Sequence, residues 1–170
     1  MANTVAKKPA RRSRRRSAQN TLILAAATAL GLGYMPKAPG TFGTLFAIPL
    51  WFLLSHLSFW PSLILVVLAV LCSIVIADQA ERIFGHHDEQ RIVIDEVAGL
   101  LVTSVGVPFL WPEVLSAFVL FRLLDMTKPP PIGWLDRKVQ GGLGVVLDDV
   151  AAGLVACLLL HLGRFFLRGF

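Results

Sequence analysis

The chain has 170 residues, enough for one domain, and its composition is too apolar for an ordinary soluble domain. Hydrophobic residues make up 55% of the sequence and charged residues 16%, whereas soluble domains carry about 25% charged residues. Both cysteines, Cys72 and Cys157, lie inside apolar runs, which argues against a disulfide framework. The composition therefore predicts association with a membrane.

The net charge of +5 arises in the N-terminal segment. Seven of the 16 basic residues lie within residues 1–16, and the rest of the chain has nine bases and 11 acids. We predict that residues 1–19 form a disordered basic tail on an anionic membrane surface, where each base contributes about 1 kcal/mol. Nucleic-acid binding is disfavoured, because no basic face continues the run. A signal peptide is also disfavoured, because a cleavage site within residues 25–29 would leave too short an apolar segment.

Apolar segments with polar connections predict an all-α fold for residues 20–170, treated as one domain, since alternation with a period of two is absent. Residues 20–35 are predicted to form a short interfacial or re-entrant helix. A membrane-associated bundle of about five apolar helices follows, at residues 45–59, 62–77, 97–110, 114–124 and 150–167. Several of these segments are shorter than the roughly 20 residues of a complete membrane span.

Helices that alternate in direction would collect the polar connections on one side of this bundle. Ten of the 11 acidic residues and 14 of the 16 basic residues would then lie there. The positive-inside rule places such a side in the cytoplasm. We therefore expect the catalytic loops to gather on the cytoplasmic side of the membrane.

Two pairs of adjacent carboxylates are the main candidates for a metal site. Asp95-Glu96 and Asp148-Asp149 are each predicted to begin an apolar helix. One carboxylate at such a position can cap backbone N–H groups, but two adjacent ones point about 100° apart and cannot both cap. Carboxylate oxygens are preferred ligands of Mg²⁺. The hypothesis is that all four bind Mg²⁺, with capping as the alternative, and that Gly99 lets another helix pack closely.

Basic residues near the second pair suit a phosphate group. Arg122 and Asp125 are three residues apart and share a helix face, so an ion pair within the helix is the alternative interpretation. Lys128 precedes three prolines, which force the chain out of the helix at a fixed point. Arginine binds phosphate oxygens through its planar fork, and lysine binds them as a point charge.

The segment PKAPGTFGT at residues 36–44 is predicted to be a loop before the helix at Leu45. Backbone N–H groups of a glycine-containing loop at a helix N-terminus bind anions, although the same residues also form ordinary caps. Other polar residues precede the first acidic pair. Asp78 and Glu81 share a helix face, and His86, His87 and Asp88 form a possible metal cluster, but a loop this polar is more often simply solvated.

Four motifs in this order, APGTFGT, IDEVAGL, FRLLDMTKPPPIGWLDRKV and GGLGVVLDDVAAG, resemble the phosphatidylglycerophosphatase A family. The resemblance covers about residues 31–159 and leaves out the basic tail. It implies a Mg²⁺-dependent lipid phosphatase of the bacterial cytoplasmic (inner) membrane. Such an enzyme hydrolyses the phosphomonoester of phosphatidylglycerophosphate, yielding phosphatidylglycerol and inorganic phosphate.

The resemblance suggests roles for the candidate residues, written here as a hypothesis. One or two Mg²⁺ ions are held by the metal ligands Asp95, Glu96, Asp148 and Asp149. The ions neutralise the phosphate and activate a water molecule. The catalytic residues are Asp95, Glu96, Asp125 and Asp149, with Asp125 positioning Lys128 or acting as a further ligand. The phosphate is bound by Arg122 and Lys128, together with Lys37, Gly40, Thr41 and Thr44. The apolar helices receive the acyl chains.

Other phosphatase chemistries lack their motifs. Neither cysteine begins a Cys-x5-Arg motif, no Asp-x-Asp is present, and the motifs of histidine-nucleophile lipid phosphatases are missing. A CDP-alcohol phosphotransferase would require paired aspartates on adjacent helical turns, which Asp148-Asp149 does not match. A transporter or channel for a divalent cation or phosphate would require charges deep within the spans, whereas here they gather at helix ends. These two remain the alternatives, and the sequence indicates no oligomeric state.

Overall fold

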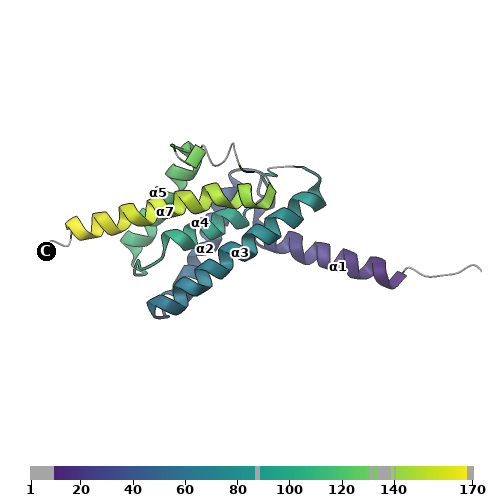
Figure 1. Cartoon of the computed structure of the whole chain (residues 1–170), viewed down its shortest axis with the longest axis horizontal. Helices are drawn as coiled ribbons and strands as arrows, with labels where there is room; N and C mark the ends of the chain where they lie inside the picture. The colour runs from purple at the N-terminus through teal and green to yellow at the C-terminus, as the bar shows by residue number, and fades with distance from the viewer. Residues whose placement is uncertain (1–9, 87–88, 131, 134–138, 140, 168–170) are drawn as a thin grey trace, which may run out of the picture.

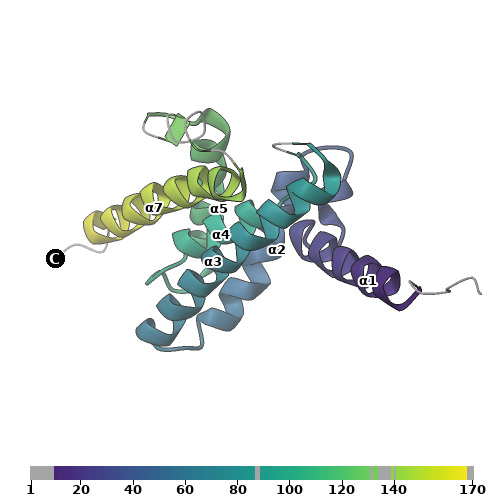
Figure 2. The ribbon, with the colours of Figure 1, turned by 45° about the vertical axis from the view of Figure 1, so that its right-hand side comes forward.

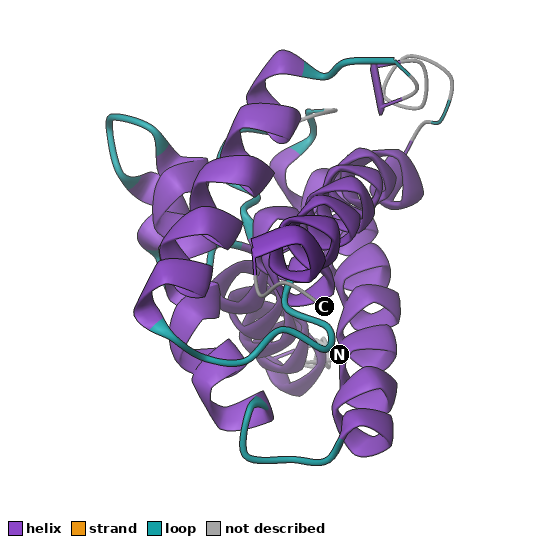
Figure 3. Ribbon diagram, turned by 90° about the vertical axis from the view of Figure 1, so that its left-hand side faces the viewer, coloured by secondary structure: helices purple, strands orange, loops and turns teal. Residues whose placement is uncertain are grey.

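The computed structural model describes residues 10–86, 89–130, 132–133, 139 and 141–167 (Figure 1). For residues 10–15 it describes the backbone alone. Within these ranges the chain forms α-helices joined by turns and contains no strand (Figure 3). The elements are α1 (Ala10–Ala27), the short 3₁₀ helix η1 (Leu32–Tyr34), α2 (Pro39–Leu54), α3 (Phe59–Phe84), α4 (Ile94–Thr103), α5 (Trp111–Thr127) and α7 (Gly141–Leu167). The all-α prediction is confirmed, with slightly more helices than the expected five.

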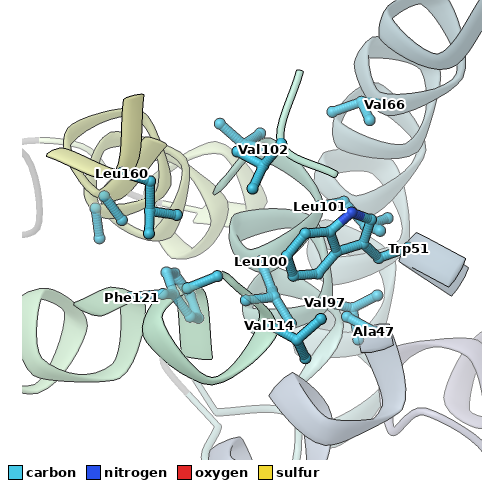
Figure 4. Close-up of a cluster of buried hydrophobic side chains, with 14 of the residues drawn as sticks. Ala47, Trp51, Val66, Val97, Leu100, Leu101, Val102, Val114, Phe121 and Leu160 are labelled. Atoms are coloured by element: carbon cyan, nitrogen blue, oxygen red, sulfur yellow. The ribbon is translucent and has the colours of Figure 1, made fainter. Parts of the chain in front are cut away.

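Helix α4 lies at the centre of the bundle and contacts α2, α3, α5 and α7. All of its residues from Val97 to Thr103 are buried, and they pack with large side chains such as Trp51 and Phe121 (Figure 4). The contact between α4 and α7 depends on two glycines. A Cβ at Gly153 would collide with the Gly99 carbonyl oxygen, and one at Gly99 would collide with the Phe121 ring. The predicted close packing at Gly99 is confirmed.

Helices α3 and α7 are long and apolar enough to cross a membrane, with mean hydropathies of 2.7 and 2.2 over their most apolar 18 residues. Only 11% of that stretch of α3 is buried inside the protein. Exposed apolar side chains such as Ile64, Leu71 and Val75 cover its outer face. A continuous apolar surface of this kind is unusual on a soluble monomer and supports membrane association.

The helices begin or end differently from the prediction, and the helix predicted at residues 97–110 spans Ile94–Thr103 instead. Helix α2 begins at Pro39 rather than Leu45, and α7 begins at Gly141 rather than Val150, so two segments predicted to be glycine loops are first turns of helices. Proline suits the first helical position. The glycine at 142 fits where α7 crosses the α3 backbone at Ile74 and Asp78. Helix α3 continues through polar residues to Phe84, because Gln, Glu and Arg favour helix.

Helix α1 extends away from the bundle, and its C-terminal half packs against α3 (Figures 1 and 2). It begins at Ala10, so residues 10–19, predicted to be disordered, are helical in the structure. Its last residue, Ala27, is fully buried, and the Ala27 carbonyl accepts a hydrogen bond from the Val93 N–H. Residues 1–9 lie outside the described residues, and their disorder stays a prediction.

Candidate active site

A cavity of about 480 Å³ opens at the end of the bundle where α2, α4 and α7 begin and α5 ends. The alternating helix directions therefore bring the predicted polar segments together at one end. The charged residues that line the cavity are Glu89, Asp95, Glu96, Asp125, Lys128, Asp148 and Asp149. Six of these seven are carboxylates, so the cavity carries a strong negative charge unless cations or protons compensate it.

Three carboxylates form the centre of the cavity, here called the carboxylate trio: Asp95 and Glu96 in the first turn of α4, and Asp149 in the third turn of α7. One oxygen from each lies within 4.8 Å of the other two. Glu96 Oε2 and Asp149 Oδ2 are buried and have no hydrogen-bond partner among the described residues. Buried anionic oxygens without partners are costly, and a hard divalent cation is the group they fit.

Withdrawal from water raises the pKa of Asp95 well above its ordinary value, and the charges of Glu96 and Asp149 raise it further. Burial is also the main cause of a raised pKa at Glu96. These shifts describe the metal-free site, in which protons take the place of a cation. A bound divalent cation would displace them, so metal binding at the carboxylate trio is coupled to proton release.

Asp148 does not join the carboxylate trio, although it is adjacent to Asp149. Its Oδ2 accepts a hydrogen bond from Lys128 Nζ at 2.7 Å. Lys128 ends α5 with left-handed backbone geometry (φ 41°) and lines the cavity. Of the four predicted metal ligands, the structure therefore brings three together and pairs the fourth with the predicted phosphate-binding lysine.

Arg122 lies behind the acidic wall of the cavity. Its Nη1 donates to Asp125 Oδ2 at 2.6 Å and lies 3.9 Å from Glu96 Oε1. The three side chains are each about 15% exposed or less, so this ion pair is well shielded from water. The alternative interpretation of an ion pair within the helix is confirmed. Asp125 was predicted to position Lys128, but in the structure it contacts Arg122, and Lys128 pairs with Asp148. Arg122 thus holds two carboxylates of the wall in position.

Gly40 is the one predicted residue of the 37–44 segment that lines the cavity. A Cβ at this position would collide with the Glu96 carboxylate and would come within 3.0 Å of Arg122 Nη1, so only glycine allows this approach. Thr44 is fully buried, and its hydroxyl donates to the Gly40 carbonyl at 2.9 Å. Lys37 and Thr41 do not line the cavity either. Thr41 and Thr44 lie within α2, so helical geometry determines where their side chains point, whereas Lys37 precedes the helix.

Sequence reasoning did not select Glu89 and Gln90, both of which line the cavity. Arg91 Nε and Nη2 each donate to one Glu89 carboxylate oxygen at 2.8 Å. The same guanidinium lies 4.3 Å from the centroid of the Phe84 ring, and these contacts fix the segment. Of the possible metal cluster predicted nearby, His86 does not line the cavity, and residues 87–88 lie outside the described residues. The signal in the sequence that could have identified Glu89 is the arginine two residues after it, Arg91.

Comparison with known proteins agrees with this arrangement. Residues 25–164 match the family model described as phosphatidylglycerophosphatase A. A phosphatidylglycerophosphatase A from Escherichia coli is 39% identical over 136 residues, covering 79% of each chain. The Haemophilus influenzae protein of the same name is 37% identical over 132 residues, covering 76% of this chain and 81% of its own.

A third relative, from Bacteroides thetaiotaomicron, is provisionally named as a phosphatidylinositol-3-phosphatase. It is 37% identical over 146 residues, covering 81% of this chain and 90% of its own. No solved structure matches the chain. The matched residues include α4 and α7 as far as Arg164, and therefore the whole carboxylate trio. The chain belongs to the phosphatidylglycerophosphatase A family.

Proposed function

We propose that the protein hydrolyses the phosphomonoester of phosphatidylglycerophosphate to phosphatidylglycerol and inorganic phosphate, with Mg²⁺ as its cofactor. The observation that carries the proposal is the carboxylate trio, whose buried oxygens lack partners, in a cavity at one end of an apolar bundle. Membership of the phosphatidylglycerophosphatase A family argues against the transporter and CDP-alcohol phosphotransferase alternatives. Hydrolysis makes the protein a phosphoric monoester hydrolase.

Asp95, Glu96 and Asp149 are the residues that would hold Mg²⁺. When bound, the ion supplies charge neutralisation for the phosphate and acidifies a coordinated water molecule. Lys128 lies on the cavity wall and can donate from its ammonium group to the phosphoryl oxygens. Its contact with Asp148 orients the ammonium group before the substrate arrives.

Arg122 acts through the carboxylates that it holds. Its hydrogen bond fixes Asp125 at the cavity wall, where this carboxylate is placed to accept a proton from the attacking water. The same guanidinium faces Glu96 at 3.9 Å and limits its movement. A positively charged group behind the acidic wall also lowers the cost of gathering several carboxylates in one cavity.

The position of the cavity suits a lipid substrate in the bacterial inner membrane. The phosphate enters at the end of the bundle, while the acyl chains remain beside the exposed apolar faces of α3 and α7. We place this end in the cytoplasm, because Arg82, Arg91, Arg122 and Lys128 belong to it, whereas Arg164 lies near the other end of α7.

A substrate with a phosphate on an inositol ring is the second candidate. The relative named for that activity is as similar to this chain as one of the phosphatidylglycerophosphatases, at 37% identity. Both substrates present a phosphomonoester on a lipid headgroup, so the carboxylate trio and Lys128 would serve either. Parallel assays with phosphatidylglycerophosphate and phosphatidylinositol 3-phosphate decide between them.

The experiment is phosphate release from short-chain phosphatidylglycerophosphate by detergent-purified protein, with Mg²⁺ and with a chelator. We expect release that requires Mg²⁺ and is lost in Asp149→Asn. Asp78→Asn is the matched control, because Asp78 lies on the neighbouring helix α3, pairs with Arg82 at 2.8 Å and does not line the cavity. Wild-type turnover by Asp149→Asn would contradict the metal assignment, and no release from either lipid would contradict the proposed function.

A further inference from the structure

A second cavity, of about 380 Å³, lies at the opposite end of the bundle and is here called the far cavity. It is lined by the end of α2, the start of α3, the loop between α4 and α5, and Arg164 on α7. In Figures 1 and 2 this is the end where the α2–α3 turn lies, remote from α1. Arg164 is about 22 Å along α7 from Asp149, at 1.5 Å per residue. The far cavity is therefore separate from the candidate active site.

Arg164 provides the only formal charge among the residues that line the far cavity in the described part of the chain. Its Nη1 donates to the Gly106 carbonyl over a long 3.3 Å, and its Nε is buried without a described hydrogen-bond partner. A guanidinium stays protonated at all accessible pH values and offers five donors. The far cavity thus holds a permanent positive charge whose hydrogen-bonding capacity is incompletely used.

The backbone dipoles around the far cavity have both signs, because α3 and α5 begin at this end and α2 and α4 end there. Two carbonyl groups that follow α4 have other partners: Ser104 O accepts from Val107 N at 3.0 Å, and Val105 O lies 2.9 Å from His161 Nε2. Helix α3 begins at this end, and its N-cap Ser58 makes no side-chain capping bond. The first turn of a 26-residue helix carries partial positive charge on its N–H groups. The charge that favours an anion in the far cavity is therefore that of Arg164.

The side chains around this end place it at the surface of a bilayer. Trp60 and Trp111 are 70% and 77% exposed, and Phe59 is half-exposed and packs against Trp60. Tryptophan is enriched at membrane–water interfaces, at the depth of the lipid headgroups. Phe59 also lines the far cavity, so the cavity opens at this depth. The anion available there is the phosphate of a phospholipid.

We propose that the far cavity binds the phosphodiester headgroup of an anionic phospholipid in the leaflet opposite the active site, with Arg164 as the counter-ion. Ser55 and Ser62, which also line the cavity, provide hydroxyl groups for the headgroup. The site takes a lipid that is not hydrolysed, since no acidic residue lines it among the described residues. The proposal does not depend on the proposed function of the other end.

The test is a lipid titration of full-length protein in neutral detergent with a chelator present, following the melting temperature by circular dichroism. Phosphatidylserine should raise the melting temperature saturably, whereas a neutral galactolipid and inorganic phosphate should not. Arg164→Gln should weaken the apparent affinity for phosphatidylserine by about tenfold or more, because a charge-assisted hydrogen bond is lost. Arg164→Lys, which keeps the charge, should retain part of the affinity.

Two further variants make the result specific. Arg82→Gln removes a cation from the other end, where Arg82 pairs with Asp78 at 2.8 Å outside the active-site cavity, and it should keep the full response. Ser62→Phe fills the far cavity while keeping Arg164, and it should abolish the response; this variant decides the question if Arg164→Gln does not fold. A wild-type response in Ser62→Phe, or an equal response to the galactolipid, would overturn the proposal. A response to inorganic phosphate alone would show a site for free anions instead of a lipid headgroup.

Discussion

The two acidic pairs look alike in the sequence and differ in the structure. Asp95-Glu96 contributes both of its carboxylates to the trio. Of the second pair only Asp149 belongs to the trio, and Asp148 pairs with Lys128. The difference follows from position in the helix. The first pair lies in the first turn of α4, where both side chains reach the open end of the bundle. The second pair lies in the third turn of α7, where side chains about 100° apart meet different neighbours.

The largest expected effect comes from substituting the two members of the second pair one at a time. Asp149→Asn should lower kcat/KM by more than about 100-fold, because even outer-shell partners of metal ligands cost about 10- to 100-fold. Asp148→Asn should cost less, because this residue only orients Lys128. The measurement is phosphate release across a Mg²⁺ titration, in which Asp149→Asn alone should shift the Mg²⁺ dependence strongly. Equal losses and equal Mg²⁺ shifts in the two variants would show that the pair acts as a unit.

The next effect concerns the partner of Asp148. Lys128→Gln should raise KM about tenfold, because one charge-assisted contact to the phosphate is lost. Adding Asp148→Asn to this variant should have little further effect, since the residue then has no lysine to orient. A double-mutant cycle on kcat/KM measures this coupling. Additive losses would mean that Asp148 acts on the metal or the substrate directly.

A smaller effect is expected where α4 and α7 cross, since this contact brings the two pairs together. Gly153→Ala should destabilise the protein by about 1–3 kcal/mol, because its Cβ would collide with the Gly99 carbonyl. Gly163→Ala on the same helix is the matched control, because a Cβ there meets nothing within 4 Å. Thermal melting in detergent compares the two variants. Equal stability of both would mean that the helices separate at little cost.

The smallest effect is a pH dependence that belongs to the first pair. Burial raises the pKa of Asp95 and of Glu96, so the folded metal-free protein holds protons that the unfolded chain releases. The resulting stabilisation is complete below the unfolded carboxyl pKa of about 4 and is lost as pH rises through the raised values. We expect the melting temperature in a chelator to fall with rising pH, and Mg²⁺ to reverse the fall. Asp95→Asn should flatten the profile, and an unchanged slope in that variant would assign the effect to other groups.

Much of this protein follows from local features of its sequence. Apolar runs without period-two alternation are sufficient for an all-α bundle, and the four motifs are sufficient for the family. The ion pair of Arg122 with Asp125 could also be predicted, because residues three apart on a helix share a face. The residues at which helices begin were harder to predict. Glycines in residues 40–44 and 141–144 indicate loops by their propensity, and only the close contacts in the structure explain why glycine is required in these helical turns.

The tertiary structure alone decided which carboxylates meet. Asp95 and Asp149 are distant in the sequence, and their proximity requires α4 and α7 to touch backbone to backbone at Gly99 and Gly153. The pairing of Lys128 with Asp148 likewise depends on where α5 ends relative to the third turn of α7. The sequence by itself determined the all-α class, the family and the residue types of the site, because these depend on local pattern. Packing decided the partner of each charge, because that depends on distances between separate helices.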